Sequence, residues 1–478
     1  MSKRKLILSV LINGVLLSSL YVAGAVDMTP GSGNGVAIGT GSNAPKAENV
    51  AIGKGATIEY SGGVGQPSTG DIVIGGKAHI NNYIDQGGGI AIGANSFVEN
   101  MVGGMERAFD FNQAGYKNLF GIPFGLPKNP EKMVTGMAIG QNTYARSGSI
   151  MLGTHNYKGK LGDVDVDSSN TKNNNGHLFS TTIGANSYSN GLFSSIVGAY
   201  SIASSGYPTT TADATKNFGA TITGSLNSIE SASASSQYSG VANSIVGIAN
   251  RTFNSNGSLV FGAGNEITNS VANISAPSSG GNSAKELAET LRSAVKNSNG
   301  GGSTMAFGSG NKADYTLRSA LMGVNNTLTG DQNNKSTNTM LTGFHNTADK
   351  VSNTTVIGSE NTLTNSKNSL VMGDNREVKD ANHAVLIGST DSKTTTSVNN
   401  AVAVGHNTNV TVEGGVALGS ESKATVAAGS VGYDPSTKAQ STNTDSTWKA
   451  TKSAVSVGDV NNNITRQITS VAAGTKDT

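Results

Sequence analysis

Three aspartates in one polar stretch come closest to the spacing of a metal site. Asp163, Asp165 and Asp167 form a D-x-D-x-D run, and alternating carboxylates supply the first oxygen ligands of calcium loops. An EF-hand loop also needs glycine at its sixth position and glutamate at its twelfth, where this chain has Ser168 and Asn174. We therefore interpret the run as a solvated polar loop and predict no metal site.

The other chemistry-bearing residue types form no catalytic arrangement either. The six histidines never show H-E-x-x-H spacing. His155, His345 and His406 each follow a glycine closely and stand beside an asparagine, which is typical of turns. A phosphate loop needs a strand before it and a helix after it, and the sequence around the glycine-rich stretch 31–35 indicates neither. The chain has no cysteine. We predict no catalytic residue and no cofactor.

A short phrase of two or three apolar residues followed by glycine organises the chain instead. Its glycines recur at one constant interval at Gly343, Gly358, Gly373 and Gly388, and looser copies extend toward both ends. The apolar runs are too short for helices and are bounded by turn formers, so they indicate short buried strands. An asparagine usually follows two or three residues after the glycine, which suits a left-handed turn. One such unit cannot bury its apolar residues alone, which predicts stacking into a parallel β-solenoid.

Composition agrees with a thin, exported solenoid. Only 5% of the 478 residues are aromatic and 63 are glycine, which favours many turns over one deep core. The net charge of +2 implies no nucleic-acid partner, which would need a basic patch. Basic residues 3–5, an apolar run over 6–21 and the small residues Ala23 and Ala25 have the three parts of a signal peptide. We predict cleavage that removes residues 1–25.

Insertions interrupt the predicted head, which spans residues 26–432. They are expected at 94–136, 155–180, 203–216 and 266–304. The first insertion concentrates the scarce aromatic residues, namely Phe109, Phe111, Tyr116, Phe120 and Phe124. Aromatic side chains often anchor binding hot spots, so this group is the predicted receptor-binding surface. The alternative is a small satellite core formed by the same rings.

The last insertion carries a helix signal. Residues 283–286 form a capping-box pattern, and Leu287, Leu291 and Val295 follow at four-residue spacing. These features predict a short amphipathic helix that lies against the solenoid.

The end of the chain carries the most specific pattern. A connector over 433–453 leads to a closing element over 454–478, with the string Arg466-Gln467-Ile468-Thr469-Ser470-Val471-Ala472-Ala473-Gly474-Thr475. This string resembles the neck of trimeric autotransporter adhesins with YadA-type heads. The repeats before it resemble that family's left-handed parallel β-roll head. Two positions depart from the family pattern, where Thr465 replaces the usual glutamate and Ser470 the usual asparagine.

The resemblance implies an all-β, homotrimeric head on the bacterial outer membrane. In the family, neck residues lock three chains together, and the matching positions here are Arg466, Gln467, Ile468, Val471 and Gly474. A stalk and a membrane-anchoring C-terminal segment, both absent from this chain, are expected beyond Thr478. Members bind host matrix proteins or cell-surface glycoproteins, including carcinoembryonic-antigen-related adhesion molecules (CEACAMs). The resemblance therefore implies a surface adhesin with such a partner.

Two other classes remain as alternatives. A trimeric β-helical polysaccharide-degrading enzyme would need paired carboxylates on one strand face. Acidic residues are sparse here, and none are paired at two-residue spacing on a repeat strand. A passive spacer would need no aromatic insertion. Both observations, together with the neck string, favour adhesion.

Overall fold

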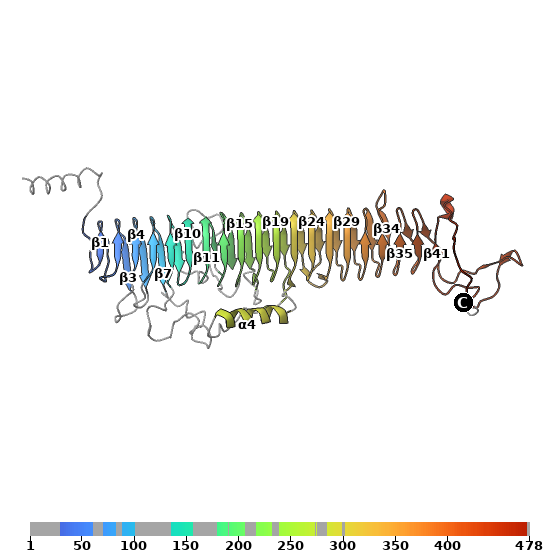
Figure 1. The fold of residues 1–478 in the computed structure, drawn as a ribbon, viewed down its shortest axis with the longest axis horizontal. Coiled ribbons are helices and arrows are strands. Elements are labelled where there is room, and N and C mark those ends of the chain that lie inside the picture. The colour runs from blue at the N-terminus through green and yellow to red at the C-terminus, as the bar shows by residue number, and fades with distance from the viewer. Residues whose placement is uncertain are drawn as a thin grey trace, which may run out of the picture.

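The computed structural model shows a long rod of stacked coils (Figure 1). It describes residues 29–475 except for 61–69, 83–87, 101–134, 156–178, 190, 206–216, 232–238, 273, 275–283 and 299–301. The predicted signal peptide, the receptor-binding aromatic residues and the D-x-D-x-D run lie outside the described residues. Within the described part, no helix is long and apolar enough to cross a membrane.

One parallel sheet, here called the long sheet, extends along the whole rod, and consecutive coils each add one strand to it. Its strands are β1 (Val36–Ile38), β2 (Val50–Ile52), β4 (Ile72–Ile74), β6 (Ile90–Ile92), β8 (Met137–Ile139), β10 (Ile150–Thr154), β11 (Thr181–Ala185), β13 (Ser195–Val197), β15 (Thr221–Ser225), β17 (Ser244–Ile248), β19 (Leu259–Ala263), β21 (Met305–Ser309), β24 (Ala320–Val324), β27 (Met340–Phe344), β29 (Thr355–Ser359), β31 (Leu370–Met372), β33 (Val385–Ile387), β35 (Val402–Val404), β37 (Val416–Leu418) and β41 (Val455–Ser456). This arrangement confirms the predicted parallel β-solenoid.

The strands that follow the glycine turns form the second face of the rod, also with parallel pairing. They are β3 (Thr57–Tyr60), β5 (His79–Asn82), β7 (Phe97–Asn100) and β9 (Tyr144–Arg146), then β12 (Tyr188–Ser189), β14 (Ile202–Ser205), β16 (Ser228–Ser231), β18 (Arg251–Phe253), β20 (Glu266–Thr268), β22 (Lys312–Asp314), β25 (Thr327–Thr329), β28 (Thr347–Asp349), β30 (Thr362–Thr364), β32 (Arg376–Lys379) and β34 (Thr394–Thr396), and last β36 (Asn409–Val410) and β38 (Lys423–Ala424). Shorter elements are the pair β23 (Thr316–Leu317) and β26 (Ser336–Thr337), the antiparallel hairpin β39 (Tyr433–Asp434) and β40 (Ala439–Gln440), and the 3₁₀ turn η4 (Val460–Asn462).

The repeat glycines allow the coils to stack closely. Gly343 has a φ of +125°, and a Cβ built on it would lie 1.9 Å from the carbonyl oxygen of Gly358 in the next coil. No side chain fits at that distance, and a left-handed φ is costly for residues with a Cβ. The glycine in the phrase is therefore required by both backbone angle and contact.

Most long-sheet strands send only their second residue into the core. In β33, Leu386 is fully buried, whereas Ile387 is 36% exposed. The apolar runs are strands, as expected, but in most of the three-residue runs only one residue is buried. The core consists of such single, small or medium side chains from both faces of the coil, for example Val356 of β29 and Leu363 of β30, and it is as thin as the composition predicts.

Buried asparagines form a ladder inside the central coils, where the sequence suggested turn residues. The rungs are Asn227, Asn250, Asn265, Asn311, Asn326, Asn346 and Asn361. Asn361 Nδ2, for example, donates to Asn346 Oδ1 at 2.9 Å and to the carbonyl oxygen of Gly373 at 2.7 Å. Asparagines one residue nearer the glycine, such as Asn375 with φ 60°, do have the predicted left-handed conformation.

The predicted helix is confirmed as α4 (Ala284–Asn297). It lies lengthwise along the rod (Figure 1). Leu287 is 8% exposed and packs in an apolar cluster with Phe218 and Val241 of two coils, while Leu291 and Val295 pack at the edge of the same cluster. The helix therefore bridges successive coils from outside, as its apolar spacing predicts.

Several predicted insertion boundaries are wrong because second-face strands look polar in sequence. Residues 97–100, 203–205 and 266–268 belong to β7, β14 and β20, although we assigned them to insertions. In β20 the single apolar core residue, Ile267, stands between the polar residues Glu266 and Thr268. The boundary between head and closing element also differs, because β41 pairs with β37 and so extends the long sheet.

Candidate interaction surfaces

The outer face of the long sheet is apolar along most of the rod. The first and third residues of its strands point outward, and most of the exposed large apolar side chains of the described residues lie on these strands. They are Val36, Ile72, Ile74, Ile150, Ile183, Val197, Ile248, Phe261, Met322, Val324, Phe344, Met372, Ile387, Leu418 and Val455. An exposed apolar surface of this extent marks a protein interaction site. We call it the apolar stripe.

The sequence contains a signal for the apolar stripe, since a thin solenoid with small turns is expected to expose an apolar flank along its length. Three consecutive apolar residues in a strand place apolar side chains on both faces of a sheet, whereas a strand with one solvated face alternates. Val385-Leu386-Ile387 and Val402-Ala403-Val404 show this pattern. The core takes the middle residue, and the two outer residues are left for a partner.

The closing element contacts the last coil through one of its predicted neck residues. The Arg466 guanidinium donates to Ser422 Oγ at 3.0 Å and to the main-chain oxygens of Ser420 and Val457. Nearby, the Lys423 ammonium lies 2.8 Å from Asp459 and holds the pKa of that carboxyl below its usual value. Arg466 therefore ties the predicted neck to the solenoid within one chain.

The remaining predicted neck residues extend away from that contact. Gln467, Ile468, Val471 and Gly474 are all exposed, Ile468 by 71% and Val471 by 69%. Exposed apolar residues in a segment without regular structure suit contact with other chains. Their predicted role in trimerisation stays a prediction.

A row of aromatic rings lies on the second face, on β5, β7 and β9. The ring centroid of Phe97, in β7, is 5.0 Å from that of His79 and 5.4 Å from that of Tyr144 in the neighbouring coils. Tyr144 also donates a hydrogen bond to Glu99. The segment with the predicted receptor residues follows β7 in the sequence and lies outside the described residues.

A charge cluster lies on the outer surface of the second face. The Arg251 guanidinium forms two 3.1 Å bonds with the Glu230 carboxylate and one of 2.9 Å with Glu266. These bonds, those to Glu230 first, raise the pKa of Arg251. One cation thus bridges the carboxylates of the two strands on either side of its own, which links three successive coils.

Asp71 is a buried carboxyl that the sequence did not single out. It is fully buried beside β4 and accepts hydrogen bonds from Tyr60 Oη at 2.7 Å, Asn82 Nδ2 at 3.0 Å and the Gly89 amide at 2.9 Å. Burial raises its pKa, while these three bonds and the charge of Lys46 oppose the rise. The effect of burial on the pKa is the larger one because none of the hydrogen-bond donors to Asp71 carries a positive charge.

This raised pKa predicts a pH dependence of stability in the first coils. Because the folded pKa exceeds the unfolded one, the contribution of Asp71 to stability is fully present below the unfolded pKa and is lost as pH rises through the folded pKa. We expect hydrogen exchange of the β4 and β6 amides to show more frequent opening at pH 7 than at pH 4.5. Asp71→Asn should remove this difference, whereas exchange that stays equally pH-dependent in Asp71→Asn would assign it to other groups. Asp445→Asn, in the exposed connector, is the control.

The described residues define the chain as a parallel β-solenoid with an exposed apolar face along its length. A segment of 63 residues, 13% of the chain, is 51% identical to the autotransporter adhesin BadA of Bartonella henselae and spans 2% of that protein's length. No model of a known protein family matches the chain. The similarity supports a surface adhesin of the autotransporter kind.

Proposed function

We propose that this chain is the head of a bacterial surface adhesin that works as a homotrimer. The apolar stripe is the observation that supports the proposal most strongly, because a lengthwise apolar face on a thin solenoid needs a partner of equal length. Three copies around one axis supply that partner, and rotational symmetry makes every coil face its equivalent. The similarity to an autotransporter adhesin supports the same assembly. It also favours binding over catalysis.

The proposal includes export and display on the outer membrane. Residues 1–25 act as a cleaved signal peptide, residues 433–453 connect the head to the neck, and residues 454–478 lead to a stalk. The rod then holds its insertions away from the bacterial surface. The partner is a host cell-surface glycoprotein, of which the CEACAMs are the first candidates, or a matrix protein.

The receptor-binding surface in this proposal is the aromatic segment between Phe109 and Phe124. Its support is the concentration of rings in a chain where aromatics are scarce. The row of His79, Phe97 and Tyr144 on the strands that precede and follow it in the sequence adds support, because loops carried on a rigid scaffold are where binding residues concentrate.

Single alanine variants at three of these rings test the surface. For Phe111→Ala, Phe120→Ala and Phe124→Ala we expect binding to host cells or to immobilised CEACAM to weaken about thirtyfold, or roughly 2 kcal/mol, with little change in Tm. If the rings instead form a satellite core, each variant should lose roughly 3–5 kcal/mol of unfolding free energy. Phe253→Ala, on the outer surface of β18, is the matched control. Three folded variants that bind as the parent does would contradict this site.

A further inference from the structure

The most regular part of the solenoid contains one coil of unusual length. The step from Gly323 to Gly343 is longer than the three equal steps that follow, through Gly358 and Gly373 to Gly388. Gly330 occupies the position of Asn365 in a regular coil, and Ser336 that of Ser366. The extra residues are therefore 331–335, inserted at a single corner of the rod.

Hydrogen bonds give this inserted loop a defined shape. The Asp331 carboxylate accepts the backbone amides of Asn333 at 2.8 Å and Asn334 at 2.7 Å, and the Asp331 amide donates to the Asn334 carbonyl at 3.0 Å. The Lys350 ammonium lies 3.1 Å from Asp331. The bond from the Asn334 amide, then that from Lys350 and then that from the Asn333 amide lower the pKa of Asp331 to about 2. The loop is thus closed on itself and pinned to the next coil.

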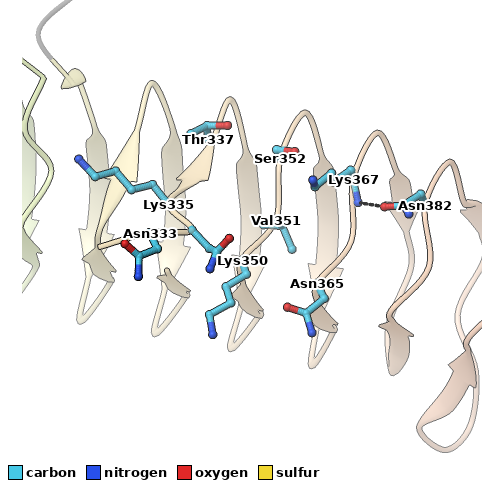
Figure 2. Close-up of a pocket in the computed structure, with 10 residues that line it drawn as sticks. Asn333, Lys335, Thr337, Lys350, Val351, Ser352, Asn365, Lys367 and Asn382 are labelled. Atoms are coloured by element: carbon cyan, nitrogen blue, oxygen red, sulfur yellow. Dashed lines mark hydrogen bonds between the residues drawn. The ribbon is translucent and has the colours of Figure 1, made fainter. Parts of the chain in front are cut away.

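The loop forms one wall of an open groove of about 660 Å³ that continues over the following coils (Figure 2). Three lysines from successive coils line the groove, Lys335, Lys350 and Lys367, and no carboxylate is among its lining residues. The other lining side chains are mostly amides and hydroxyls, such as Asn365 and Ser352. A surface with these groups offers cations together with many neutral donors and acceptors.

The three ammonium groups differ in how far they are already engaged. Lys350 pairs with Asp331, and Lys335 donates to the carbonyl oxygen of Val271 at 3.3 Å, which leaves its charge without a counter-charge. The Lys367 backbone amide donates to Asn382 Oδ1 at 3.0 Å, and its ammonium has no ion-pair partner in the described part of the chain. The ammonium groups of Lys335 and Lys367 are therefore available to bind an anion.

We propose that this groove binds an anionic saccharide, a sugar chain that carries sulfate or carboxylate groups. Lys335 and Lys367 would contact the anionic groups, and the amides and hydroxyls between them would pair with sugar hydroxyls. An acidic peptide fits less well, because the only apolar lining residue is the buried Val351 and the groove offers no pocket for a side chain. This site is additional to the proposed receptor surface and does not depend on it.

A deletion that restores the regular coil gives the sharpest test. Removing residues 331–335 leaves a coil of the regular length with glycine at its left-handed corner, and it removes one acidic and one basic residue, so the net charge is unchanged. We expect the full chain to bind a heparin oligosaccharide or a hyaluronan oligosaccharide in calorimetric titration, more weakly as salt screens the exposed charges. Because the deletion also frees Lys350 from Asp331, it is combined with Lys350→Gln. The combined variant should weaken binding at least about tenfold while Tm stays close to that of the parent.

Point variants keep the test valid if the deletion perturbs folding. Lys335→Gln and Lys367→Gln should each weaken binding about twofold to fivefold, and the double variant about tenfold, as expected for exposed charge pairs. Lys54→Gln, an exposed lysine on a distant coil, should change nothing. The proposal is overturned if neither saccharide binds, if the double variant binds as the parent does, or if neutral maltohexaose or polyglutamate binds as tightly.

Discussion

Replacing Arg376 with methionine is expected to unfold the last coils of the solenoid before the rest of the rod. Arg376 is fully buried. Its guanidinium donates to the carbonyl oxygens of Gly388 at 2.7 Å, Gly405 at 3.1 Å and Thr408 at 2.6 Å, and to Thr408 Oγ1 at 3.0 Å. Methionine fills similar space but removes the side-chain donor of the Gly388 and Thr408 carbonyl oxygens, while the Gly405 oxygen keeps the Thr408 hydroxyl as a donor. A buried polar group that loses its partner costs about 1–3 kcal/mol, so we expect a loss of at least about 3 kcal/mol.

The effect should be large because Arg376 replaces missing rungs of the asparagine ladder. Its backbone amide donates to Asn361 Oδ1, the last asparagine rung, at 2.9 Å. The next coil, from Gly388 to Gly405, is longer than a regular coil, and Asp391 stands at its exposed surface where a rung would lie. The long guanidinium side chain reaches across this coil to the following one. One arginine therefore connects three coils through hydrogen bonds.

Denaturant unfolding and hydrogen exchange measure this effect. Amides of β33, β35 and β37 should exchange faster in Arg376→Met, while those of β15 and β17 should not change. Arg318→Met is the matched control, because exposed Arg318 donates only to Asn338 Oδ1 at 2.8 Å and should cost little. Arg376→Asn should lose less stability than Arg376→Met, because an asparagine side chain at this position can still donate a hydrogen bond to the Gly388 carbonyl oxygen. Equal unfolding midpoints for Arg376→Met and Arg318→Met would show that water replaces the guanidinium without cost.

The sequence allowed prediction of the coil but not of the bonds between coils. The spacing of Gly343, Gly358 and Gly373 predicted stacking, because glycine at a fixed period has a clear steric meaning. Asparagine has two roles in this fold, a left-handed turn and a buried rung, and they differ by one position after the glycine. A single sequence does not distinguish them, since both roles suit the same side chain. Arg376 was missed for the same reason, because it stands where a turn residue was expected.

The candidate surfaces were predictable in unequal measure. The apolar stripe can be predicted from strands with three apolar residues, because only one of the three is buried in the core and the other two point outward. The groove had a signal as well, the long step from Gly323 to Gly343, but coil length has no functional meaning until the position of the extra loop is known. The contacts that hold the loop at Asp331 include Lys350 of the next coil. Which residues of two coils face each other depends on how the coils stack, and the sequence does not show this.

Introducing one aspartate into the apolar stripe is expected to dissociate the proposed trimer. Met322 lies on the outer face of β24, 37% exposed in the single chain, between Phe307 and Thr342 of the neighbouring strands. In a trimer, Met322→Asp would bury three carboxylates without partners. An unpaired buried charge costs about 3–5 kcal/mol, which corresponds to more than about a hundredfold weaker association. Analytical ultracentrifugation should show monomers with the circular dichroism of the parent.

The same coil provides the control. Thr327 lies on the outer surface of β25, beside Lys312 of the preceding coil, so Thr327→Asp adds the same charge on the second face next to a cation. This variant should remain a trimer. If both variants dissociate, the added charge destabilises the coil itself; if neither does, the long sheet is not the contact surface.

The parent chain itself gives the decisive result. A chain that sediments as a monomer at micromolar concentration, with native circular dichroism, would contradict the trimer unless fusion of a trimeric coiled coil after Thr478 restored it. Deleting residues 454–478 should weaken the trimer more than deleting the polar segment 161–176, because Ile468 and Val471 are exposed in the single chain and Arg466 fixes their position. The apolar stripe and the neck would then act together. The stripe provides contact area along the rod, and the neck sets the register in which three identical faces meet.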